Sequence, residues 1–120
     1  MTFDVEIVLK GRDFAVTQAL TIPHGEPASW SDEAVRDALV SILRAIDRAG
    51  NPDVDPDRGV VLRGFSWIVE PSGTDVVLAI EIPMGAAVAG PFAIGQKEFD
   101  AMITRVIRGA AGRARSPTVH

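Results

Sequence analysis

The fold of this chain is decided at residues 3–9, where the sequence FDVEIVL places an apolar residue at every odd position. An alternation with a period of two is typical of a strand that buries one face. The next four residues, KGRD at 10–13, are polar and include a glycine, which suits a hairpin turn. A second alternating stretch fills residues 14–22 and ends at Pro23, because proline has no N–H to donate to a sheet. Together these residues predict an antiparallel hairpin with one face against a core.

Two later segments carry apolar residues at helical spacing. The first covers residues 32–49, where Ser31 is a suitable N-cap and Gly50 follows the last helical position. The second covers residues 96–108 and is expected to stop at Gly109. Both segments are predicted to be amphipathic helices that pack one side against a sheet.

Two more strands are expected between the helices, at residues 59–70 and 75–82. The chain then reads as strand, strand, helix, repeated twice. This order predicts an α+β domain with the arrangement ββαββα, in which a four-stranded antiparallel sheet carries both helices on one face. The domain is expected to span residues 1–110, and residues 111–120 are expected to form a basic C-terminal tail.

The charges and the missing cysteines exclude several classes of function. Residues 101–120 carry four arginines and no acid, whereas residues 1–100 hold eight basic and all sixteen acidic residues. A mainly acidic body argues against nucleic acid as the principal partner. The absence of cysteine excludes disulfides and thiolate metal ligands and fits a reducing compartment. With no apolar leader and no long apolar span, we expect a cytoplasmic protein without a membrane partner.

The apolar content is high, at 47% of the residues, and part of it is expected at an interface. Residues 59–70 are apolar at both parities, which one layer of helices cannot cover. Residues 83–95 are uncharged, and we expect them to form a long loop that packs on the core, on a ligand or on another subunit. The sequence therefore predicts a homo-oligomer, most simply a two-fold dimer, that could hold a small apolar molecule. The candidate ligand-binding residues are Arg63, Trp67, Met84 and Phe92.

The alternative interpretation is a small hydrolase or isomerase that needs no cofactor. Its candidate acid–base residues are His24 with Glu26, which follows two positions later, or with Glu81. A histidine after a strand and before a helix is more typical of an ordinary surface loop. Ser66 lacks the glycine-flanked elbow of a nucleophile, and no phosphate-binding loop is complete, so no cofactor is expected.

Three aspartates at alternate positions resemble the start of a calcium loop: Asp53, Asp55 and Asp57. The pattern fails where it is specific, because Arg58 stands at the position of the required glycine and Gly64 at that of the bidentate glutamate. No metal site is therefore predicted. The sequence favours a non-catalytic binding and assembly module over the enzyme, and it names neither ligand nor partner.

Overall fold

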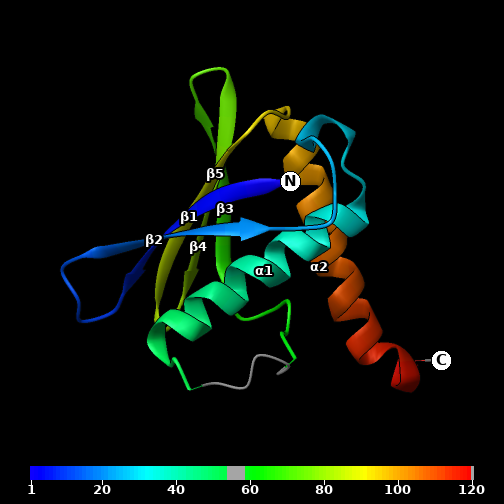
Figure 1. Ribbon diagram of the computed structural model, residues 1–120. Coiled ribbons are helices and arrows are strands. Elements are labelled where there is room, and N and C mark those ends of the chain that lie inside the picture. The colour runs from blue at the N-terminus through cyan, green and yellow to red at the C-terminus, as the bar shows by residue number, and fades with distance from the viewer. Residues whose placement is uncertain (54–58, 120) are drawn as a thin grey trace.

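The computed structural model describes the backbone of residues 1–53 and 59–119, and the side chains of these ranges up to Gly109. It is an α+β domain with an antiparallel sheet and two α-helices, as the sequence predicts (Figure 1). The elements in chain order are β1 (Thr2–Leu9), β2 (Ala15–Thr21), the short 3-10 helix η1 (Pro27–Ser29), α1 (Asp32–Gly50), β3 (Ser66–Ser72), β4 (Asp75–Ile82), β5 (Gly85–Phe92) and α2 (Gln96–Val119).

The described sheet has five strands rather than the predicted four. Their order is β2-β1-β5-β4-β3, and every neighbouring pair is antiparallel. The additional strand, β5, lies at the centre of the sheet, where the sequence predicted a loop over residues 83–95. The segment lacks charge because β5 is hydrogen-bonded to a strand on each side and buries one of its faces in the core. Ala87, Ala89 and Phe92 are the residues buried there. Gly85 is required because a Cβ at this position would lie 2.6 Å from the Val8 carbonyl oxygen.

Two predicted boundaries were wrong. The strand expected at residues 59–70 begins only at Ser66, and the described residues before it form no strand. Of the apolar residues in that earlier segment, Leu62 packs in the core and is 5% exposed, whereas Val61 lies on the surface. The second helix does not stop at Gly109 but continues to Val119, so the predicted boundary of the basic tail lies inside α2.

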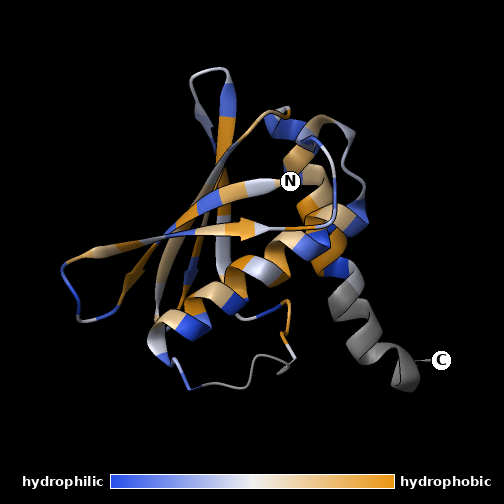
Figure 2. Cartoon of the chain, viewed as in Figure 1, coloured by the Kyte–Doolittle hydropathy of each residue, from blue (hydrophilic) through white to orange (hydrophobic). Residues whose placement is uncertain are grey.

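The helices cover one face of the sheet. Along β1, exposed and buried residues alternate strictly, and the four buried side chains face α1 and its neighbours. Figure 2 shows the corresponding alternation of apolar and hydrophilic residues along the β1–β2 hairpin. An aromatic cluster packs the core near the start of α2, with ring centroids 5.1–6.1 Å apart, and consists of Phe3, Trp30, Phe92 and Phe99. The opposite face of the sheet has no covering element in the part of the chain that the structure describes.

A surface ion pair joins the two helices. Arg105 of α2 donates through Nε and Nη2 to the two carboxylate oxygens of Asp32, each at 2.9 Å. The hydrogen bonds from Arg105 hold the pKa of the Asp32 carboxyl below its ordinary value.

Neither α1 nor the described part of α2 is long and apolar enough to cross a membrane.

Candidate functional site

The first candidate surface is the uncovered face of the sheet, which we call the open face. Strand register places Ile68, Ala79 and Val88 side by side on it, with Glu6 next in the same row. Ile68 is 53% exposed and Val88 is 46% exposed. Val8 lies in the adjacent row and is 41% exposed. Contiguous apolar side chains at the middle of a sheet mark an interaction surface more often than isolated ones do.

The charged side chains that the strands place on the open face are all acidic. The five strands contain no lysine and no arginine. Four exposed acids stand on the open-face positions of β1, β3 and β4: Asp4, Glu6, Glu70 and Glu81. The apolar centre of this face is therefore bordered by acids on the strands, and Lys10 and Arg12 of the β1–β2 turn line one hollow at its end.

The open face is hollowed near Glu81. One depression of about 320 Å³ is lined by Ile68, Ala79, Glu81 and Ala86 together with neighbouring residues of β3 and β5. Two more depressions, of about 540 and 490 Å³, adjoin it and also include Glu81 in their linings. They lie at the surface and do not enclose a ligand as deep small-molecule sites do. Such hollows suit side chains presented by a partner.

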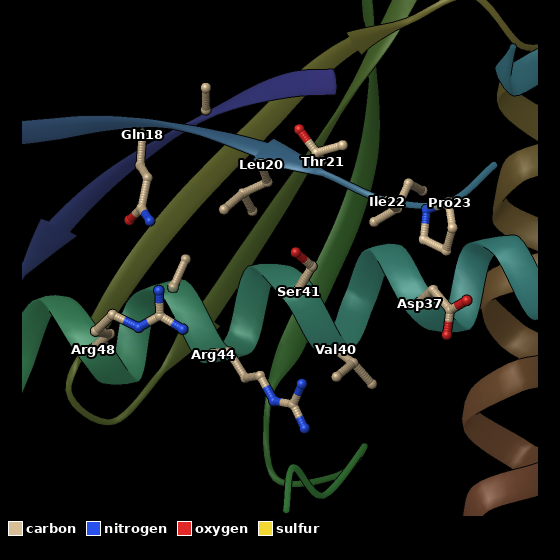
Figure 3. Close-up of a pocket in the computed structure, with 12 residues that line it drawn as sticks. Gln18, Leu20, Thr21, Ile22, Pro23, Asp37, Val40, Ser41, Arg44 and Arg48 are labelled. Atoms are coloured by element: carbon tan, nitrogen blue, oxygen red, sulfur yellow. The ribbon is translucent and has the colours of Figure 1, made fainter. Parts of the chain in front are cut away.

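The second candidate surface is a groove of about 470 Å³ between the edge strand β2 and α1, which we call the β2–α1 groove. Its buried lining residues are apolar and include Leu20, Ile22 and Ala45. Figure 3 shows Gln18 and Arg48 extending into the space between strand and helix, with the Arg44 side chain pointing outward at the rim. Half-buried Val40 also lines the groove, which accounts for an apolar residue on the otherwise polar side of this helix.

His24 lies just beyond the end of β2 and pairs with Asp37 of α1. Its Nε2 is 2.7 Å from the Asp37 carboxylate, with both side chains partly exposed. Glu26, the first partner suggested by the sequence, is exposed, and neither it nor Glu81 has a hydrogen bond to His24 in the described structure. Ser41 lines the same groove as Asp37 but has no hydrogen bond to His24, so the pair aligns no hydroxyl nucleophile among the described residues.

The residues suggested for ligand binding are dispersed. Arg63 is exposed in the segment before β3, and Trp67 is half-buried on the helix side, opposite Ile80. Met84 lies at the turn between β4 and β5, where its carbonyl accepts a hydrogen bond from Lys10. Phe92 is fully buried in the aromatic cluster. No cavity among the described residues brings these four together, and their role in binding stays a prediction.

Little in the sequence indicates either surface. Asp37 is thirteen positions from His24 and sits among other polar residues of α1, so its pairing has no local signal. The free edge of β2 depends on strand order, which alternation alone does not fix. Val40, an apolar residue on the otherwise polar side of α1, was the one sign of the groove in the sequence.

No metal centre is evident in the described ranges, since no three histidine or acidic side chains gather there. Two of the three aspartates that resemble a calcium loop, Asp55 and Asp57, lie outside the described residues.

Comparison with known proteins adds no assignment: no protein-family model, no curated protein and no solved structure matches this chain.

Proposed function

We propose that this domain is a non-catalytic binding module that docks a partner protein on its open face. The observation that carries the proposal is the apolar centre formed by Ile68, Val88 and Val8, which no described element covers. Burial of such side chains provides about 25 cal/mol per Å² of apolar area removed from water. An apolar centre within a polar rim is the usual form of a protein interface.

The charge of the open face specifies the partner's chemistry. Acids border the apolar centre, and none of the five described strands carries a basic residue. The bases Lys10 and Arg12 line only the hollow at the β1–β2 turn. A partner that presents apolar side chains flanked by lysine or arginine complements both properties. We therefore propose a basic amphipathic segment of another protein as the occupant.

A second copy of the chain, which the sequence suggested, complements this face less well. Face-to-face pairing would bring the acids of two open faces together, and like charges across an interface oppose association. The enzymatic alternative also has less support, because Glu81 stands on the open face whereas His24 contacts Asp37 of the β2–α1 groove. No described hydroxyl group is hydrogen-bonded to His24.

A titration with model peptides tests the proposal. The probe is a helical peptide of leucine and lysine with one apolar side, and its counterpart carries glutamate in place of lysine. We expect the lysine peptide to bind with an affinity that falls as salt rises, because screening weakens exposed charge pairs. Val88→Asp should weaken binding by about tenfold or more, which corresponds to about 1.4 kcal/mol.

A matched pair of double variants separates local from overall charge. Glu6→Gln with Glu81→Gln removes two acids from the open face, and Glu33→Gln with Glu98→Gln removes two exposed acids from the helices. Only the first should weaken binding of the lysine peptide. Equal binding of both peptides, or equal effects of both double variants, would refute the proposed partner. A dimer mass by light scattering that reverts to a monomer in Val88→Asp would assign this face to a second copy instead.

A further inference from the structure

The free edge of the sheet at β2 is open to strand addition. Within the described sheet, β2 is the terminal strand and pairs only with β1. Met1 and Ile22 exchange two backbone hydrogen bonds at the end of this pairing. Because hydrogen-bonded pairs alternate along an antiparallel ladder, the backbone groups of Val16, Gln18 and Leu20 face β1. Those of Thr17, Ala19 and Thr21 consequently point outward.

This edge lacks the features that usually block pairing. Edge strands are normally protected by charged side chains, proline or a bulge. β2 has the sequence AVTQALT, without charge or proline, whereas the opposite edge strand, β3, contains Glu70 and Pro71. The two edges therefore differ in their capacity to accept a further strand.

The β2–α1 groove lies beside this edge and gives an added strand somewhere to place its side chains. A strand that extends the sheet at β2 directs alternate residues toward the helix side, over Leu20, Ile22 and Val40. Farther along the same side, Val16 is 38% exposed and Phe14 is 59% exposed. Backbone pairing thus supplies affinity and the groove supplies side-chain selection, which is the logic of strand addition in peptide recognition.

The groove also carries a charge preference. Its described lining holds two arginines, Arg44 and Arg48, and neither forms an ion pair with a described residue. The single acid of the lining, Asp37, already contacts His24. Arg48 and Gln18 lie at the same end of the groove (Figure 3). An occupant antiparallel to β2 places its carboxyl-terminal half at that end.

We propose that the β2–α1 groove binds an extended peptide segment of a partner protein, with apolar residues toward the groove and an acidic residue near its carboxyl end. A second copy fits less well, because β2 contains no acid and its inward side chain Leu20 is buried in its own core. This site is separate from the open face, so its proof or failure does not decide the function proposed above.

The test uses a seven-residue peptide with an acetylated amino end and an amidated carboxyl end. Threonine occupies every odd position, and the groove-facing even positions carry valine, valine and glutamate in that order. A counterpart has lysine in place of glutamate. We expect isothermal titration calorimetry to show binding of the glutamate peptide and about tenfold weaker binding of the lysine peptide at low salt. Arg48→Glu should reverse this preference, and the control Arg108→Glu, on an exposed part of α2, should leave it unchanged.

Backbone pairing is tested on the peptide, so that no variant has to fold. Residues whose N–H groups point at β2 have side chains on the open-face side, which are the threonines. N-methylation of the threonines should abolish binding, and N-methylation of the groove-facing residues should preserve it. In amide-exchange measurements the N–H groups of Thr17, Ala19 and Thr21 should become protected when peptide is added.

Three outcomes would overturn the inference. They are no binding of either peptide at millimolar concentration, binding that is indifferent to the methylation pattern, and protection of the Thr17, Ala19 and Thr21 amides in a dimer without peptide. The last would assign the edge to a second copy of the chain. Loss of peptide binding here with intact binding on the open face would leave the proposed function untouched.

Discussion

The two faces of the sheet are made by alternate residues of the same strands, yet they have opposite characters. On the helix side, Val5 and Ile7 of β1 are at most 1% exposed. On the open side the same strand presents Asp4, Glu6 and half-exposed Val8. One face is thus committed to stability, and the other keeps apolar and acidic groups at the surface, where a partner can use them. Apolar content alone therefore does not say which residues stabilise the fold.

The strongest way to separate the faces is to place one charge on each at neighbouring positions. Ala89 of β5 is 1% exposed and Val88 is 46% exposed. Ala89→Asp buries a carboxylate without a partner and should cost several kcal/mol, enough to prevent folding of a marginally stable domain. Val88→Asp should change stability by less than about 1 kcal/mol. Circular dichroism and urea unfolding distinguish the two, and similar losses in both variants would mean that the open face is covered.

The strand β5, which contains both residues, also shows where the sequence stops predicting the fold. β1 and α1 could be predicted because each element buries only one side. The buried residues therefore recur with a period of two in β1 and at helical spacing in α1. β5 has small residues on both sides, as at Ala86 and Ala87, so no period is visible and the segment resembles a loop. The bounds of β3 were misplaced because Leu62 contributes to the core from a segment that forms no strand.

The candidate surfaces were less predictable than the fold. Both depend on which strands become neighbours, and therefore on contacts between residues far apart in the chain. Glu81 and Val8 line a common depression because β4, β5 and β1 lie side by side, an order that the sequence does not reveal. The same holds for His24, whose partner Asp37 lies on another element.

A smaller effect is expected from truncation within the helix layer. Leu39 of α1 is fully buried in the core, and Leu39→Ala should reduce the free energy of unfolding by about 2–5 kcal/mol through lost contacts and a residual cavity. Ile68→Ala, on the open face, should cost less than about 1 kcal/mol because its side chain is already half in water. Chemical denaturation of the two variants measures both values. A loss below about 0.5 kcal/mol for Leu39→Ala would place this residue outside the core.

The smallest expected effect on stability comes from charged residues, which form an ion pair in the helix layer and none on the described open face. In the helix layer Asp32 is paired with Arg105, whereas Glu6 stands on a strand without basic residues. The pKa of Asp32 is lowered by its hydrogen bonds to Arg105 from an ordinary value of 3.8. A carboxyl with a lowered folded pKa stabilises the fold above its unfolded pKa, and this contribution is lost as the pH falls through the folded value. Asp32→Asn should therefore lower the Tm slightly at neutral pH.

The difference between the wild-type protein and Asp32→Asn should shrink in acid and in high salt, because the pair is exposed and screened. Glu6→Gln is the matched control, and it should leave the Tm unchanged or raise it slightly at neutral pH by removing one of several like charges. Thermal unfolding at neutral pH and again below pH 3, at low and high salt, supplies the measurement. If Asp32→Asn lowered the Tm equally at every pH, the contribution of Asp32 would not depend on its ionised carboxylate. The contrast between a paired helix layer and an unpaired open face would then have to rest on the exposed apolar residues alone.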